Sequence, residues 1–220
     1  MTGLEVVVFD VDDTLYLERD YVKSGFRAVG DWLTSARGVD GFSDVAWQVF
    51  LEGVRGKIFN QALERLGVAD DLETIRTLIE VYRHHTPDIT LLPDAHAAIT
   101  QAHARGKVAV ITDGPVASQE RKVKALGLER WASPIICTWR AGRAFGKPHV
   151  RAFQEVEAAT GARGDALVYV ADNPTKDFVG PKALGWRTLR IRRPGGLNTD
   201  IPSGDDVDVE CEGTLSEVWA

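Results

Sequence analysis

The sequence predicts an α/β protein with a doubly wound, mostly parallel sheet and an inserted α-helical domain. Three observations indicate this fold: short apolar runs alternate with helical patterns, polar residues follow the runs directly, and a long segment separates the first two runs. Runs that are apolar throughout are typical of strands covered on both faces. Strands that alternate with helices are typical of a parallel sheet.

Five short runs are predicted as strands. Four of them are apolar up to a polar or acidic last residue, whereas the fifth alternates polar and apolar residues. The predicted strands are residues 6–10, 108–112, 135–138, 167–172 and 187–191.

Helical patterns separate the later strands, and each pattern is followed by a glycine. The predicted helices are residues 94–105, 117–126, 149–160 and 175–184. A residue in the left-handed conformation commonly ends a helix, and glycine adopts it without steric cost. We therefore expect left-handed caps at Gly106, Gly127, Gly161 and Gly185.

The segment between the first two strands is too long for an ordinary crossover, which needs one helix and two short loops. It is not of low complexity, because four stretches carry apolar residues at helical spacing: 21–34, 44–55, 58–66 and 72–85. We therefore predict a helical cap domain at residues 16–88. Residues 1–15 and 89–220 are predicted to form the α/β core domain.

Composition excludes several classes of protein. The 220 residues include 26 Lys and Arg against 32 Asp and Glu, a formal net charge of −6, which disfavours a nucleic-acid binder. No apolar run approaches the roughly 20 residues that a membrane span needs. Acidic residues follow the N-terminus closely, which is unlike a secretory signal. Only Cys137 and Cys211 are present, too few for a disulfide framework, so we expect a cytoplasmic protein.

Polar residues follow four of the predicted strands. In an open parallel sheet, ligands bind outside the carboxyl ends of the strands. The sequence places Asp10, Asp12, Asp13 and Thr14 after the first strand, Thr112, Asp113 and Gly114 at the second, Gly146, Lys147 and Pro148 after the third, and Asp172, Asn173 and Asp177 after the fourth. Such a carboxylate cluster needs a lysine and a divalent cation to balance it, and oxygen ligands suit Mg²⁺. An anionic substrate on a metal is therefore predicted.

This set of residues resembles the haloacid dehalogenase-like hydrolase superfamily, in its branch with a helical cap. The resemblance rests on four motifs in order: Asp10-x-Asp12-x-Thr14, Thr112, Lys147, and Asp172 with Asp177. Each motif alone is weak, but four in order, each at the end of a predicted strand, are specific. The resemblance covers the whole chain.

The resemblance implies a two-step phosphoryl transfer. Asp10 would be the nucleophile and would form an aspartyl-phosphate. Asp12 would act as general acid for the leaving alkoxide and then as general base for water. Mg²⁺ would be held by Asp10, the backbone carbonyl of Asp12, and Asp172.

The remaining motif residues would bind phosphate or support the metal. Thr112, Lys147 and the backbone N–H groups of Asp113 and Gly114 would bind the phosphate oxygens. Asp177 would orient Lys147 or a metal-bound water from outside the ligand set. Asn173 would bond a metal-bound water, although a plain Asx turn is an equal alternative.

Asp12 favours phosphate chemistry over dehalogenation, because a halide leaves without a proton. The resemblance therefore implies a phosphatase acting on a small phosphorylated metabolite such as a sugar phosphate or a nucleotide. A phosphomutase is the alternative, and a non-catalytic binding module is disfavoured because every motif residue is present. No nucleic acid or membrane partner is expected, and the protein is expected to be a monomer or a homodimer.

Several polar residues are interpreted as structural. Asp13 is expected to cap a turn or a helix. The histidines His84, His85, His96 and His103 are expected on helix surfaces. Arg190, Arg192 and Arg193 follow or end the fifth strand, and we interpret them as a solvated surface cluster rather than as a site that steers an anionic substrate.

Overall fold

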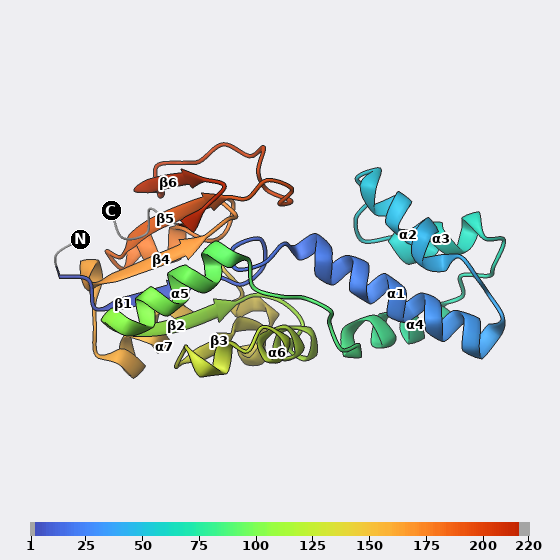
Figure 1. Ribbon diagram of the computed structural model, residues 1–220, viewed down its shortest axis with the longest axis horizontal. Coiled ribbons are helices and arrows are strands. Elements are labelled where there is room, and N and C mark those ends of the chain that lie inside the picture. The colour runs from blue at the N-terminus through green and yellow to red at the C-terminus, as the bar shows by residue number, and fades with distance from the viewer. Residues whose placement is uncertain (1–2, 216–220) are drawn as a thin grey trace. The chain divides into compact units, whose positions relative to one another are not determined.

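Within residues 3–215, the part of the chain that the computed structural model describes, six parallel strands form one sheet in the order β3-β2-β1-β4-β5-β6 (Figure 1). The strands are β1 Val6–Phe9, β2 Lys107–Thr112, β3 Ile135–Cys137, β4 Leu167–Ala171, β5 Arg187–Arg192 and β6 Val209–Glu212. The order reverses at β1, which has β2 on one side and β4 on the other. This reversal is the point at which doubly wound sheets bind their ligands.

In the described part of the chain, five α-helices lie between β1 and β2, and one α-helix lies between each later pair of consecutive strands up to β5. The helices are α1 Glu18–Arg37, α2 Phe42–Leu51, α3 Ile58–Arg65, α4 Leu72–His84, α5 Pro93–Arg105, α6 Val116–Ala125, α7 Arg151–Thr160 and α8 Val179–Ala183. Among residues 3–215, no helix combines the length and the apolar character that crossing a membrane requires. The α/β class that the sequence predicts is confirmed.

Buried β-branched and aromatic residues form the core of the sheet. Every residue of β1 is buried, and Val7 pairs with Val108 of β2 and with Val168 of β4. On one face, Phe153 of α7 and Trp186 pack against Val6, Val8 and their neighbours on β2 and β4. Helix α5 also contacts β2 and lies in front of the sheet in Figure 1. Coverage of both faces explains the uninterrupted apolar runs.

The chain divides into two compact units, one with residues up to Arg19 and from Thr90 onward, and the other with Asp20–Ile89. The second unit has its own core, formed by apolar faces of α1–α4 that include Phe26, Leu33 and Leu63. Residues 26, 29 and 33 lie on one face of α1 because of their spacing. The predicted role of residues 16–88 as a cap domain stays a prediction.

Two predictions about local structure are wrong. Gly106 is extended, with φ −174°, rather than left-handed. A glycine is needed at this position because a Cβ would lie 2.5 Å from the carbonyl oxygen of Glu5. The predicted helix 175–184 is confined to α8, because Asn173 forms a turn whose side-chain oxygen accepts from the N–H of Thr175 at 2.9 Å. The left-handed conformation is present at Gly127, Gly161 and Gly185.

Two predictions of solvated side chains are also wrong. Arg190 and Arg193 are buried, because each guanidinium donates to backbone carbonyls: Arg190 to Asp172 at 3.0 Å, and Arg193 to Thr14 at 2.7 Å. His85 is buried as well, at the end of α4, where its ring packs against Tyr21 and Tyr82. Five donors on one guanidinium can satisfy several carbonyls at once, which makes buried arginine tolerable.

Candidate active site

Four predicted site residues converge at the carboxyl ends of neighbouring strands. Asp10 directly follows β1, and Asp172 directly follows β4. Because β1 and β4 are adjacent and parallel, with Phe9 paired to Val170, the two carboxylates are brought to the same edge of the sheet. The loop after β3 returns Lys147 to this edge, and the turn after β4 adds Asp177.

Lys147 joins the carboxylates into one buried network. Its Nζ lies 2.8 Å from Oδ1 of Asp10 and 2.6 Å from Oδ1 of Asp177, and it donates to the hydroxyl of Tyr169 at 3.0 Å. The side chains of Lys147 and Asp177 have no exposed surface. Burial alone opposes the charge of an ammonium, yet Asp10 and Asp177 raise the pKa of Lys147 well above its ordinary value. Lys147 therefore stays charged.

The three carboxylates of this network can carry more negative charge than Lys147 neutralises. Carboxylate oxygens of Asp10, Asp172 and Asp177 all lie within 4.8 Å of one another, and all three residues are buried. Burial raises the pKa of Asp10 to about 6, although Lys147 lowers it. Burial, followed by repulsion from Asp177 and Asp10, raises the pKa of Asp172 well above its usual range. A divalent cation is the group whose charge and preference for oxygen fit this donor set.

Asp177 lies against Lys147, and its predicted role in orienting Lys147 or a metal-bound water stays a prediction. Its carboxylate is also spaced from those of Asp10 and Asp172 as a third ligand would be. Oδ2 accepts from the N–H of Asn173 at 3.0 Å, which fixes the turn after β4. The side chain of Asn173 forms the Asx turn, and its predicted bond to a metal-bound water stays a prediction.

Asp12 lies apart from these three carboxylates and has partners of its own. Lys122 of α6 donates to both of its oxygens, at 2.7 and 2.8 Å, and the hydroxyl of Tyr16 donates to Oδ1. Burial opposes the charge on Asp12, but Lys122 and Tyr16 hold its pKa below the ordinary value. The predicted use of its backbone carbonyl as a metal ligand stays a prediction.

The residues after β2 form a rigid turn. Thr112 donates its hydroxyl to Oε1 of Gln119 at 2.7 Å, and Nε2 of Gln119 donates to the carbonyl of Asp113 at 3.3 Å. The carboxylate of Asp113 accepts from the hydroxyl of Thr138 and from the N–H of Lys147 at 3.1 Å. Gly114 has φ +145°, and a Cβ there would meet Gln119. Phosphate binding by Thr112, Asp113 and Gly114 stays a prediction.

A loop after β5 supports the acidic residues from another side. Asn198 donates its amide to Oδ2 of Asp172 at 2.8 Å, and the N–H of Leu197 donates to Oδ2 of Asp13 at 2.7 Å. Oδ1 of Asp13 accepts from the N–H of Glu18 at 2.8 Å, so it caps the start of α1 as predicted. These contacts order the loops on which the motif residues stand.

Sequence reasoning missed Lys122, Tyr16, Glu18 and Asn198. Lys122 and Gln119 are three residues apart on a short helix, and such spacing places two polar residues on one face, which is the signal that was present. Glu18 has no such signal; burial and then the charge of Asp12 raise its pKa to about 7. Asn198 comes from a loop far along the chain, so only the folded sheet brings it to Asp172.

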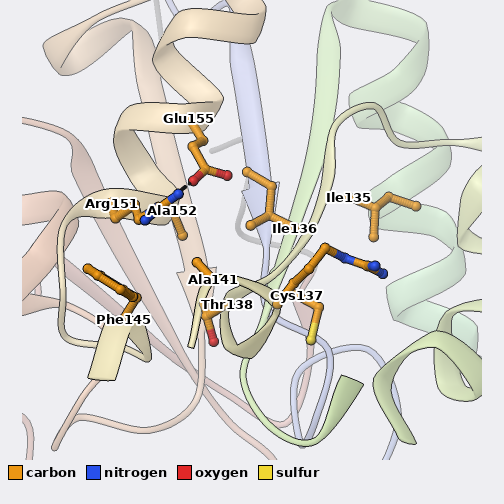
Figure 2. A pocket seen from close by; sticks show the side chains of 10 residues that line it. Ile135, Ile136, Cys137, Thr138, Ala141, Phe145, Arg151, Ala152 and Glu155 are labelled. Atoms are coloured by element: carbon orange, nitrogen blue, oxygen red, sulfur yellow. Dashed lines mark hydrogen bonds and ion pairs between the residues drawn. The ribbon is translucent and has the colours of Figure 1, made fainter. Parts of the chain in front are cut away.

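A separate pocket of about 240 Å³ lies beside the edge strand β3 (Figure 2). It is lined by residues that include Ile136, Phe145 and Ala152, and Figure 2 shows the ion pair of Arg151 with Glu155 at its rim. No predicted catalytic or phosphate-binding residue is in its described lining. The candidate active site is therefore the carboxylate network and not this pocket.

Comparison with known proteins identifies the family of this chain. A model of the haloacid dehalogenase-like hydrolases matches residues 4–185. A glyceraldehyde 3-phosphate phosphatase from Methanocaldococcus jannaschii is 30% identical over 195 residues, which cover 84% of this chain and 83% of that protein. A protein of the same name from Methanopyrus kandleri is 26% identical, with coverage of 94% and 91%.

Solved structures share the fold. The haloacid dehalogenase-like hydrolase YfnB from Bacillus subtilis, described as bound to magnesium, has a TM-score of 0.63 and 18% identity, with 94% of each chain covered. A haloacid dehalogenase-type phosphatase from Thermococcus onnurineus has a TM-score of 0.63 and 24% identity, with 98% of this chain and 96% of that chain covered. With its motif residues gathered at one sheet edge and its sequence matched over most of its length, the chain belongs to the haloacid dehalogenase-like hydrolase family, as one of its phosphatases.

Proposed function

We propose that the protein is a Mg²⁺-dependent phosphatase that hydrolyses a small phosphomonoester through an aspartyl-phosphate on Asp10. The observation that carries this proposal is the contact of Lys147 with both Asp10 and Asp177 beside Asp172. An ammonium at this point orients the nucleophile and offers its remaining charge to an incoming phosphate. The expected cytoplasmic location and the monomeric or homodimeric state remain predictions.

The donor set fits Mg²⁺. Asp10 and Asp172, together with the backbone carbonyl of Asp12, would hold the ion, and the position of Asp177 makes it a further candidate ligand. Three buried carboxylates carry two charges more than Lys147 neutralises, which is the charge of one Mg²⁺. The bound ion supplies charge stabilisation to the oxygens of the transferred phosphoryl group. A similar fold described as bound to magnesium supports this assignment.

Asp10 would act as the nucleophile. Its Oδ1 is held by Lys147, which directs the carboxylate and lowers its affinity for a proton. Attack at phosphorus breaks the ester bond and gives an acyl phosphate, and water then releases inorganic phosphate. Division into two steps matters because uncatalysed hydrolysis of phosphate monoesters is among the slowest reactions known.

Asp12 would serve as the acid and then the base. It gives a proton to the ester oxygen as the bond to phosphorus breaks, and it takes one from the attacking water. Its presence two residues after the nucleophile favours ester hydrolysis over halide displacement.

A three-carbon sugar phosphate is the first substrate class to test. The two relatives with the highest identities given above are both named glyceraldehyde 3-phosphate phosphatase and match most of this chain. We therefore propose glyceraldehyde 3-phosphate, or a similar short phosphorylated aldehyde or polyol, as the substrate.

The test measures phosphate release from a panel that contains glyceraldehyde 3-phosphate, glycolate 2-phosphate, glycerol 3-phosphate and nucleoside monophosphates. We expect release that requires Mg²⁺, stops with EDTA and is lost in Asp10→Asn. Asp208→Asn, a carboxylate paired with Lys182, is the matched control and should keep activity. Isomerisation of a sugar phosphate without free phosphate would indicate the mutase alternative. Inertness across the panel with Mg²⁺ present would refute the proposal in favour of a binding module.

A further inference from the structure

Helix α6 presents a buried polar face to the candidate active site. Ser118, Gln119 and Lys122 are each less than 6% exposed, although α6 is a surface helix of a small α/β unit. Gln119 holds Thr112 and the carbonyl of Asp113, while Lys122 reaches across to Asp12 in the loop after β1. One helix therefore ties together the loops that follow two adjacent strands.

Lys122 binds both carboxylate oxygens of Asp12 and so restricts the orientation of this side chain. Its Nζ lies 2.7 Å from Oδ1 and 2.8 Å from Oδ2, so the ammonium stands over both oxygens at once. The Lys122 side chain is 3% exposed and the Asp12 side chain 17%. A lysine so deeply buried loses both hydration and rotamer freedom, and a buried pair contributes little net stability. The pair is thus better explained by placement of Asp12 than by stability.

Tyr16 restrains the same carboxylate from a second direction. Its hydroxyl donates to Oδ1 of Asp12, and the two residues also form an isolated parallel bridge through their backbones. Tyr16 is buried, with 1% of its surface exposed. Asp12 is therefore held between α6 and the loop after β1, and its rotamer is determined by two donors.

We propose that Lys122 is a positioning residue, which acts through Asp12 and sets where the acid–base carboxylate stands relative to the reacting ester. This inference rests on the proposed function and adds to it the group that fixes where the acid–base carboxylate lies. No motif of the sequence analysis includes Lys122.

The chemistry defines what Lys122 should affect. When the carboxylate of Asp10 attacks phosphorus, the bond from phosphorus to the ester oxygen breaks and its electron pair goes to that oxygen. The oxygen takes the proton of Asp12, and Asp12 recovers a proton from the water that later attacks the acyl phosphate. An alkoxide needs this proton, whereas p-nitrophenolate is stable without it. A misplaced Asp12 should therefore lower the rate of hydrolysis of alkyl phosphates much more than that of p-nitrophenyl phosphate.

The experiment compares kcat/KM for these two substrates in Lys122→Met, because kcat/KM reports the steps up to loss of the leaving group. We expect a loss of roughly 100-fold for glyceraldehyde 3-phosphate, within the range of general acid catalysis, and of less than about tenfold for p-nitrophenyl phosphate. Lys122→Arg, which keeps the charge, should recover part of the loss. Lys124→Met on the exposed side of α6 is the matched control and should behave as the wild type.

Three outcomes would overturn the inference. Equal losses for both substrates would show a structural role, and an unchanged kcat/KM would show no role. A Lys122→Met change that is as harmful in an Asp12→Asn background as in the wild type would show that it does not act through Asp12.

Two further controls keep the inference testable. If Lys122→Met does not fold, Tyr16→Phe removes a single hydroxyl from the same carboxylate, and the substrate split should persist in the same direction. A wild-type protein that releases no phosphate from either ester would refute the proposed function. An active wild type whose Lys122→Met variant loses the same kcat/KM for both esters would refute only the role of Lys122.

Discussion

Replacement of Asp172 by asparagine should stabilise the metal-free protein. Asp172 is buried, and its carboxylate lies within 4.8 Å of those of Asp10 and Asp177. The substitution keeps the size of the side chain and keeps an oxygen that can accept from Asn198, but it removes one negative charge from the crowded cluster. Without a cation, that charge is opposed by burial and by its two neighbours.

The spacing sets the size of the effect. Two unit charges 4.8 Å apart repel each other by roughly 3.5 kcal/mol at an effective dielectric constant of about 20. Uptake of a proton by the cluster relieves part of this repulsion in the wild type. We therefore expect Asp172→Asn to raise the free energy of unfolding of the metal-free protein by about 2 kcal/mol. The wild type should gain about 2.7 kcal/mol from Mg²⁺ at one hundred times its Kd, and the variant should gain almost nothing. The order of stability should therefore reverse when Mg²⁺ is added.

Urea unfolding at pH 8, with EDTA and with Mg²⁺, measures all four free energies. Asp208→Asn is the control, because its carboxylate is paired with Lys182 and accepts from the N–H of Thr188 at 2.9 Å. That variant should be destabilised to the same extent in both conditions. If Asp172→Asn lowers the stability of the EDTA-treated protein, the carboxylates are not crowded and the argument for a cation between them is wrong.

Two other predictions test the packing and the electrostatics. Gly106→Ala should lower the free energy of unfolding by about 1–3 kcal/mol, because the added Cβ would lie 2.5 Å from the backbone oxygen of Glu5. Gly204→Ala is the control, because the space around Gly204 is open and the free energy of unfolding should change little. Equal effects of the two substitutions in thermal unfolding would contradict this prediction. Glu18→Gln should stabilise the protein above pH 7 by at most about 3 kcal/mol and should have no effect below pH 4.5. Between pH 4.5 and about pH 7, Glu18 keeps its proton in the folded protein but has lost it in the unfolded chain, because folding raises its pKa to about 7. The stability of the wild type therefore falls as the pH rises through this range. Urea titrations at pH 4.5 and pH 8 measure the difference, and a stabilisation that does not depend on pH would exclude this cause.

Much of the fold is readable from local sequence. Apolar runs such as Val6–Phe9 predict buried parallel strands because both faces of the sheet must be covered. Strand β6 was missed, because Val209–Glu212 is mostly exposed and carries acidic residues at the sheet edge. The buried arginines were misjudged for a related reason: a sequence does not show that the carbonyls of Asp172 and Thr14 will need donors.

The candidate site was predicted only in part. Asp10, Lys147 and Asp172 were expected together because each follows a strand, and the sheet order places them so. Their partners come from elsewhere: Lys122 projects from the middle of a helix, and Asn198 comes from a loop after the last predicted strand. Such contacts depend on side-chain direction in the folded chain, which local patterns do not encode.

Within the sheet unit, the chain segments that precede and follow the helical unit in sequence are hydrogen-bonded to each other. The N–H of Leu92, where the chain returns, donates to the carbonyl of Leu15, where it departs, at 3.0 Å. A segment whose ends are already joined adds little closure entropy, whatever its length, because that cost grows only slowly with the number of residues. The helical unit is therefore exchangeable in principle: a graft or a short turn between Leu15 and Leu92 should leave the sheet able to fold, and chimaeras could recruit new substrates without redesign of the catalytic edge.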